Sequence, residues 1–337
     1  MTTPRYRPRL PPLDGTPMLT DGGLETSLIY HEGLDLPHFA AYVLLGSASG
    51  REALERYYRR HVAIALEHGV GFVLETPTWR ASPDWGARLG HDADALAAIN
   101  REAVELMAGW RDAHDGPATP FAIGGNVGPR GDGYDPDSPL TAAEAEAYHD
   151  AQIRTFAEAG VDLVSAVTMT HVGEAVGIAR SARAHGVPVV IAFTVETDGR
   201  LPTGGTLAEA IEEVDRETDG AVAYFMINCA HPDHFRDAVA APGDWQARIR
   251  GLRANASRRS HAELDASTEL DDGDPAELGA DYASLRVHLP NLRVLGGCCG
   301  TDHRHVAAIA SRCLPAIGPD GSPRGAADGA LWNQRSN

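Results

Sequence analysis

The chain has 337 residues, of which 43% are hydrophobic, and its formal net charge is −18. A charge this negative argues against anionic partners, so we expect no binding to nucleic acid or to a membrane. All 29 basic residues are arginine. The absence of lysine excludes lysine Schiff-base enzymes and P-loop proteins, because both need a lysine amine.

The two ends of the chain differ in composition from the sequence between them. Residues 1–17 and 315–337 are rich in proline, glycine and polar residues, so we expect an N-terminal arm and a C-terminal tail. Residues 18–314 are predicted to form a single domain. Met1 to Leu13 lacks the apolar core of a signal peptide, and four cysteines in a chain of this length make no disulfide framework. These features predict a cytoplasmic protein.

Short apolar, β-branched runs alternate along the chain with longer stretches whose apolar residues recur at helical spacing. The predicted strands are Met18–Asp21, Val70–Glu75, Phe121–Gly125, Val161–Thr168, Val187–Thr194, Val222–Asn228, Ile249–Arg253 and Leu292–Gly296. The predicted helices are Arg51–His68, Ala93–His114, Ala142–Ala159, Val172–His185, Leu207–Thr218 and His303–Leu314. Such alternation indicates parallel βαβ units, and eight units of this size favour a closed (β/α)8 TIM barrel over an open doubly wound sheet.

An acidic stretch, His261–Asp281, lies between the seventh and eighth predicted strands. It is interpreted as a solvated loop and helix face rather than as a cation-binding patch.

Three cysteines stand just past predicted strands. Cys229 follows the sixth strand, and Cys298 and Cys299 follow the eighth within Gly-Gly-Cys-Cys-Gly. Active sites of (β/α)8 barrels lie at the C-terminal ends of the strands, and alternate strands contribute to the same interior layer. Adjacent side chains of a strand point to opposite faces, so two neighbouring cysteines reach one centre only where the chain curls, which glycine permits. Three converging thiolates indicate a cation, and on Zn²⁺ they leave one tetrahedral position open. Cys313 lies inside the last helical pattern and is predicted to be core.

With these motifs, the chain resembles the homocysteine S-methyltransferases, the zinc-dependent group that includes betaine–homocysteine and S-methylmethionine–homocysteine methyltransferases. The resemblance runs from about Leu19 to about Leu314. It is carried by Thr20-Asp21-Gly22-Gly23-Leu24-Glu25-Thr26, Glu75-Thr76, Asn228-Cys229 and Gly296-Gly297-Cys298-Cys299-Gly300.

The resemblance implies roles for individual residues by position match. Cys229, Cys298 and Cys299 would bind Zn²⁺, and the homocysteine thiol would take the fourth position. Asp21 would lie beside the bound amino acid, as a catalytic and substrate-binding residue. The other candidate substrate-binding residues at strand ends are Glu25, Glu75 and Asn228.

For these three residues a structural role competes with the functional one. Glu25 and Glu75 suit a cationic methyl donor, and helix capping explains them equally well. Asn228, like Asn255, either binds a substrate carboxylate or ties loops together. Trp79 either stacks on a cationic donor or packs in the protein.

We therefore expect a zinc-dependent S-methyltransferase in methionine biosynthesis, whose partners are a small-molecule thiol acceptor and a methyl donor. The expected donor is S-methylmethionine or S-adenosylmethionine, ahead of betaine, and the expected acceptor is homocysteine, giving methionine. One position departs from the family: Val167 stands where a glutamate typically holds the homocysteine amino group. Either Asp21 or another acid replaces that glutamate, or the acceptor is a different small thiol or selenol.

Two other classes remain as alternatives. A zinc hydrolase normally uses histidine and carboxylate ligands, and no His-x-His follows the first strand. A non-catalytic zinc-site binding protein would need a fourth protein ligand. His231 and His234 are not expected to be ligands, because Pro232 breaks the local geometry and three thiolates suffice. The sequence leaves open whether the chain forms a homo-oligomer.

Overall fold

The computed structural model describes residues 2–133, 139–314, 316–317 and 323–324. In this part of the chain, eight parallel strands close into a barrel in sequence order, with β1 paired to both β2 and β8. The strands are β1 (Met18–Leu19), β2 (Gly71–Glu75), β3 (Phe121–Val127), β4 (Leu163–Met169), β5 (Val189–Phe193), β6 (Val222–Asn228), β7 (Ile249–Ala254) and β8 (Val294–Gly297). The predicted (β/α)8 TIM barrel is therefore confirmed. Two short strands, β9 (Ala316–Ile317) and β10 (Pro323–Arg324), form a separate antiparallel pair.

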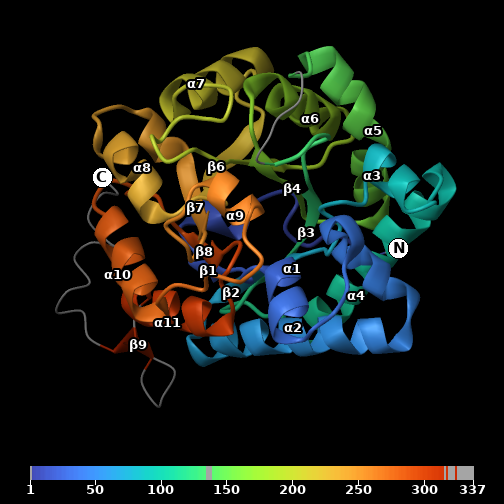
Figure 1. Cartoon of the computed structure of the whole chain (residues 1–337), viewed down its shortest axis with the longest axis horizontal. Coiled ribbons are helices and arrows are strands. Elements are labelled where there is room, and N and C mark those ends of the chain that lie inside the picture. Colours follow the sequence, from blue (N-terminus) through green and yellow to red (C-terminus); the bar gives the residue numbers. More distant parts are fainter. Residues whose placement is uncertain (1, 134–138, 315, 318–322, 325–337) are drawn as a thin grey trace.

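Helices surround the strands (Figure 1). They are α1 (Leu24–Thr26), α2 (Ala48–Glu67), α3 (Pro83–Arg88), α4 (Ala93–His114), α5 (Ala142–Ala159), α6 (Val172–Ala184), α7 (Leu207–Thr218), α8 (Pro232–Ala240), α9 (His261–Asp265), α10 (Pro275–Leu285) and α11 (His303–Cys313). Local sequence sets several of their ends. Helix α5 begins at a capping box of Thr141 and Glu144 and ends at Gly160, whose φ of 89° is the left-handed conformation that glycine adopts without strain.

Each predicted strand overlaps one strand of the barrel, with differences at the ends. Strand β1 has only two residues, although the Thr20 amide and the Asp21 carbonyl still form hydrogen bonds with β8. Helices α1, α3, α8, α9 and α10 are not among the predicted ones, and all of them are short. Helices α8 and α10 each start with a proline directly after a capping residue, His231 or Asp274. None of the helices in the described part of the chain combines the length and apolar character that crossing a membrane requires.

The strands are buried along almost their whole length, as expected for parallel strands covered by helices on one face and enclosing a packed interior on the other. The interior cluster is apolar near the beginnings of the strands. Its members include Met18, Val73, Leu163, Tyr224 and Val294. Side chains with polar groups replace them toward the C-terminal ends, so the barrel has an apolar base and a polar mouth.

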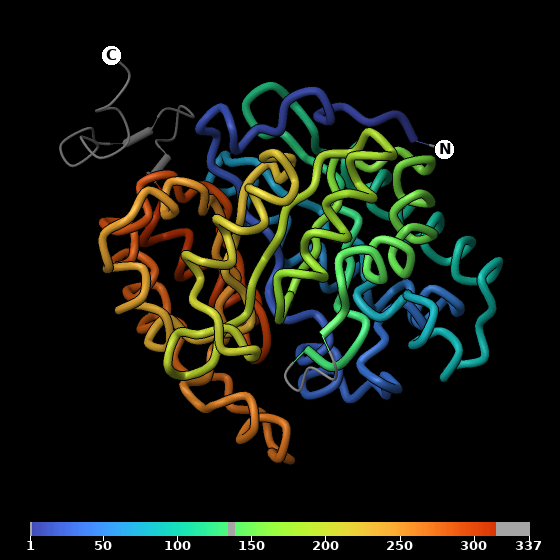
Figure 2. Tube along the Cα trace, turned by 90° about the horizontal axis from the view of Figure 1, so that it is seen from above, coloured from blue at the N-terminus to red at the C-terminus, as the bar shows by residue number. Residues whose placement is uncertain are grey.

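Residues 2–17, the predicted arm, lie across the base of the barrel. Leu10 is buried in the interior cluster, and the backbone amides of Arg5 and Tyr6 both donate to the Asp162 carboxylate. Arg7 donates to the carbonyl oxygen of Val161 at 2.8 Å. Figure 2 shows this dark blue segment at one end of the molecule, while the orange segment that contains α9 projects from the opposite end. The predicted C-terminal tail falls mostly outside the described residues.

Candidate active site

The three cysteines past β6 and β8 come together at the mouth of the barrel. The sulfur atoms of Cys229, Cys298 and Cys299 all lie within 4.8 Å of one another, and those of Cys229 and Cys299 are 3.6 Å apart. Hydrogen bonds with the Cys229 and Cys299 thiols hold the pKa of the Cys298 thiol well below its usual range. Hydrogen bonds with Cys298 and Cys299 raise the pKa of the Cys229 thiol. Three soft donor atoms this close together match the ligand set of a divalent cation such as Zn²⁺.

Cys229 has a strained backbone that the surrounding side chains hold in place. Its φ is +57°, a left-handed conformation that costs a non-glycine residue roughly 1–2 kcal/mol. Its carbonyl oxygen accepts hydrogen bonds from Asn255 Nδ2 at 3.0 Å, His261 Nε2 at 2.8 Å and Thr194 Oγ1 at 3.3 Å. Strain of this kind is typical of functional sites. Asn255 thus ties loops together, and His261, which the sequence analysis did not single out, helps to aim the Cys229 sulfur.

The loop that carries Cys298 and Cys299 depends on close backbone approach. Gly300 has a φ of +78°, and a Cβ there would lie 2.8 Å from the carbonyl oxygen of Asp271. A Cβ on Gly23 would lie 2.5 Å from the carbonyl oxygen of Cys298. That same oxygen accepts from the amide and the hydroxyl of Thr301. The glycines of both motifs therefore let the first and last strands of the barrel meet beneath the sulfur cluster.

Asn228 points toward the cysteine cluster, and its side-chain amide forms hydrogen bonds with other residues of the chain. Its Oδ1 accepts from the backbone amide of Thr168 at 2.8 Å, and its Nδ2 donates to Thr168 Oγ1 at 2.9 Å. The same nitrogen lies 3.9 Å from the sulfur of Cys298. Asn228 therefore connects the end of β4 to a cysteine, and it also lines the cavity.

Asp21 lies in a buried network with Arg253, an arginine at the end of β7 that the sequence analysis missed. The Arg253 Nη2 atom donates to Asp21 Oδ1 at 2.7 Å, and Nε donates to the carbonyl oxygen of Gly297. Asp21 also accepts from the hydroxyls of Thr20 and Tyr57. Although burial opposes it, the carboxylates of Asp21 and Glu75 raise the pKa of Arg253 above its usual value. The sequence did contain a signal for this arginine. Arg253 follows Gly251 by two residues on one strand, so both residues lie on the inward face of that strand.

Two glutamates predicted to bind substrate line the same cavity. Glu75 is almost fully buried, and its Oε1 accepts from the hydroxyl of Ser165 at 2.8 Å. Burial raises the pKa of Glu75 to about 7 and that of Glu25 to about 7. Both carboxyls can therefore change protonation near neutral pH.

Trp79 also reaches the cavity, with one face already covered. The guanidinium of Arg80 lies 4.0 Å from the centre of the Trp79 ring and 3.6 Å from that of Trp85. Burial between these rings lowers the pKa of Arg80 to about 10. The contact with Arg80 favours the packing interpretation of Trp79.

The cavity above the cysteines has a volume of about 280 Å³. Besides Asp21 and Glu75, five acidic residues line it, three of them from the acidic stretch: Glu25, Asp132, Asp265, Glu269 and Asp271. Val167 also lines it, as an apolar group.

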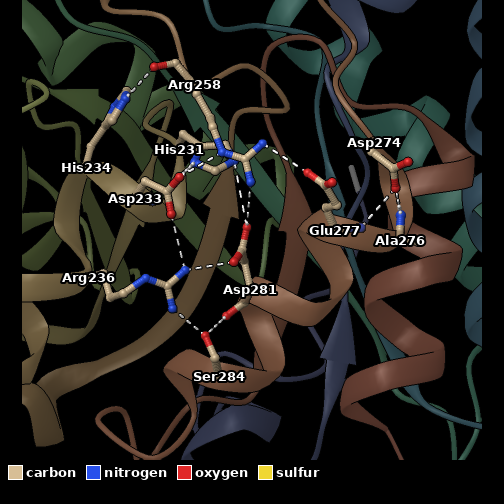
Figure 3. A network of polar contacts seen from close by, with 10 residues as sticks. All are labelled: His231, Asp233, His234, Arg236, Arg258, Asp274, Ala276, Glu277, Asp281 and Ser284. Carbon is tan, nitrogen blue, oxygen red and sulfur yellow. Dashed lines mark hydrogen bonds and ion pairs between the residues drawn. The ribbon is translucent and has the colours of Figure 1, made fainter.

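Two other acids of that stretch, Glu277 and Asp281, belong to a network of ion pairs that Figure 3 shows. Glu277 and Asp281 form ion pairs with Arg258, and Asp281 also pairs with Arg236. Within this network, His234 contacts the backbone oxygen of Arg258. These contacts fasten α10 to α8, in agreement with the structural interpretation of this part of the stretch.

His231 belongs to the same network rather than to the cysteine cluster. Its Nδ1 accepts from the backbone amide of Asp233, which caps α8, and its Nε2 lies 3.9 Å from Asp281. Burial lowers its pKa to about 4, so the ring is neutral at pH 7. Cys313 does not belong to the cysteine cluster either. It is buried in the hydrophobic core, as predicted.

The fold and site define a barrel enzyme whose chemistry centres on sulfur. The family model for homocysteine S-methyltransferase matches residues 18–313. The homocysteine S-methyltransferase of Escherichia coli K12 is 24% identical over 315 residues, which cover 88% of this chain and 94% of that protein.

Two crystal structures of the homocysteine methyltransferase MmuM from Escherichia coli share the fold. The oxidized form has a TM-score of 0.71 and 21% identity, covering 89% of this chain and 97% of that one. The metallated form has a TM-score of 0.69 and 20% identity, covering 89% and 98%. The chain belongs to the homocysteine S-methyltransferase family, and it is a thiol methyltransferase.

Proposed function

We propose that this enzyme methylates the thiol of homocysteine to give methionine, with Zn²⁺ bound by Cys229, Cys298 and Cys299. The observation that carries the proposal is the convergence of three cysteine sulfurs within 4.8 Å at the wall of a cavity. Three protein ligands leave one tetrahedral position for a substrate sulfur, whereas a structural zinc site normally has four protein ligands.

The ligand set favours zinc because thiolates select soft or borderline metals. A metallated form of the related MmuM supports a metal centre in this chain. When bound, Zn²⁺ would keep an acceptor thiol deprotonated at neutral pH. Since the three cysteines have to stay reduced to serve as ligands, we place the activity in a reducing compartment, the cytoplasm.

The methyl donor is proposed to be a sulfonium, S-methylmethionine or S-adenosylmethionine, ahead of betaine. Acidic residues are numerous in the cavity lining, with Asp265 and Glu269 among them, and such a lining favours a cationic donor over a neutral or anionic one. In the transfer, the bond from the donor sulfur to the methyl carbon breaks as the bond from the acceptor thiolate to that carbon forms. The electron pair of the broken bond leaves with the donor, which becomes a neutral sulfide. The protein contributes by holding the two sulfurs in line.

The test crosses homocysteine and other small thiols with the two sulfonium donors and betaine, and detects methylated products by mass spectrometry. Elemental analysis of the same preparation measures zinc. We expect methionine from at least one sulfonium donor and about one zinc ion per chain, as a single three-cysteine site requires. A protein that takes up no metal, or that forms no methionine with any donor, would refute the proposal.

A further inference from the structure

The amino-acid end of the acceptor needs partners that the proposed function does not yet name. On β4, the inward position near the cavity is held by Val167, whose side chain offers an ammonium group nothing. A buried ammonium without a charged acceptor loses a strong hydrogen bond. An acid from another strand therefore has to serve if the acceptor is an α-amino acid.

Asp21 has little uncompensated charge to offer an ammonium group, because Arg253 already pairs with it. Its Oδ1 accepts from Arg253 and from Thr20, and its Oδ2 accepts from the hydroxyl of Tyr57 at 3.1 Å. Its charge is matched by the guanidinium at 2.7 Å.

Glu75, unlike Asp21, has a carboxylate oxygen that no other described residue contacts by a hydrogen bond. Its carboxylate leans across β3, where a Cβ on Gly124 would lie 2.5 Å from Oε2, and it reaches Ser165 on β4. Ser165 precedes Val167 by two residues, so both side chains share the inward face of that strand. The Glu75 carboxylate thus lies beside the place of the missing β4 acid. Among the described residues, its buried Oε2 atom has no hydrogen-bond partner.

Arg253 presents the matching donor. Its Nε and Nη2 atoms are used by Gly297 and Asp21, while Nη1 is buried and has no hydrogen-bond partner within the described chain. Arg253 and Glu75 both line the cavity and attract each other electrostatically. A cation with an unpaired donor atom and an anion with an unpaired acceptor atom therefore line one cavity. An α-amino acid, with a carboxylate and an ammonium on adjacent atoms, satisfies both.

We propose that Glu75 binds the ammonium group and Arg253 Nη1 the carboxylate of the acceptor, so that an acid from β2 replaces the one absent from β4. The proposal rests on the proposed function for the thiol and deepens it. It makes Glu75 the residue that selects α-amino-acid thiols over simple thiols.

The test compares homocysteine with an acceptor that lacks its ammonium group. Homocysteine is set against 4-mercaptobutanoate, which lacks the ammonium, in the wild type, in Glu75→Gln and in the control Glu105→Gln, an exposed acid on α4. Glu75→Gln should lower kcat/KM for homocysteine about 10- to 100-fold, mainly through KM, and leave 4-mercaptobutanoate unaffected. The control should change neither. Equal effects on both acceptors, or no effect on either, would overturn the proposal.

A second measurement tests the amino-acid site independently of the methyltransferase activity. Methionine has the same amino-acid end but no thiol, so calorimetry can measure its binding without any transfer reaction. Binding that weakens about 10- to 100-fold in Glu75→Gln supports the pair, and binding that does not change refutes it. If no donor methylates any thiol but methionine still binds through Glu75, the methyltransferase function fails and the amino-acid site stands.

If Glu75→Gln does not fold, Ser165→Ala provides the same comparison. It removes the hydrogen bond that orients the carboxylate and keeps the charge. A loss confined to homocysteine supports the role of Glu75, whereas a loss shared with 4-mercaptobutanoate contradicts it.

Discussion

The ion pair between Asp21 and Arg253 should be among the most sensitive points of this barrel. The two groups are 2.7 Å apart, and their side chains are only 4% and 8% exposed, so water screens them poorly. At an effective dielectric constant of about 20 and about 4 Å between charge centres, their attraction is about 4 kcal/mol. Removing either partner leaves the other charge buried, which typically costs about 3–5 kcal/mol.

A double-mutant cycle tests this value. We expect Asp21→Asn and Arg253→Met each to lower the free energy of unfolding by about 3–5 kcal/mol. The double variant should lose less than the sum of the two by at least about 2 kcal/mol, because it buries no unpaired member of this pair. Glu75, which also faces Arg253, can accept a proton when that cation is removed.

The assay is equilibrium urea unfolding followed by tryptophan fluorescence and circular dichroism, with coincident transitions as the condition for a two-state treatment. Two results would refute the reasoning. One is strict additivity in the double variant. The other is a cost below about 1 kcal/mol for each single variant, which is the behaviour of a solvent-exposed pair.

Three further predictions concern the metal, the acceptor and pH. Cys298→Ala should abolish zinc retention and activity while circular dichroism shows a folded barrel, whereas Cys313→Ala, in the core, should keep its zinc in elemental analysis and lose about 1–3 kcal/mol in urea unfolding. Val167→Glu should not lower the KM for homocysteine when Glu75 is present, but it should lower this KM about tenfold in a Glu75→Gln background. A lower KM in the protein that keeps Glu75 would mean that Glu75 does not bind the ammonium group. Burial raises the pKa of Glu75 from 4.5 to about 7, so between these values the folded state keeps a proton that the unfolded chain has lost. Its contribution to stability therefore falls as pH rises through this window, and the urea midpoint of Glu75→Gln should fall less steeply there than that of the wild type.

Periodicity was sufficient to predict the barrel, because parallel strands covered by helices are apolar throughout and their boundaries are marked by glycine and capping residues. The Gly-Gly-Cys-Cys-Gly motif likewise placed Cys298 and Cys299 at the end of a strand. Five short helices, α1, α3, α8, α9 and α10, are not among the predicted ones. Of these, α8 and α10 begin within polar sequence.

Pairing between distant side chains was out of reach of the sequence. Arg253 meets Asp21 across 232 positions of the chain, and His261 reaches the carbonyl of Cys229 from a segment that reads as an acidic loop. Val167 signalled a missing acid, and only the packing of Glu75 against β4 points to a replacement. Such partners follow from the closure of the cylinder, which brings strands together irrespective of their separation in sequence.

The segment that closes the base of the barrel has a consequence for biosynthesis. Arg5 donates to Asp162, 157 positions later, and the carbonyl of Pro12 accepts from Arg250, 238 positions later. Residues 5–12 therefore lack their complete docking site until strand β7, which carries Arg250, has been translated. At about 5–20 residues per second, that delay is on the order of ten seconds or more. Until then Leu10 remains in water, and its burial should coincide with one of the last steps of maturation.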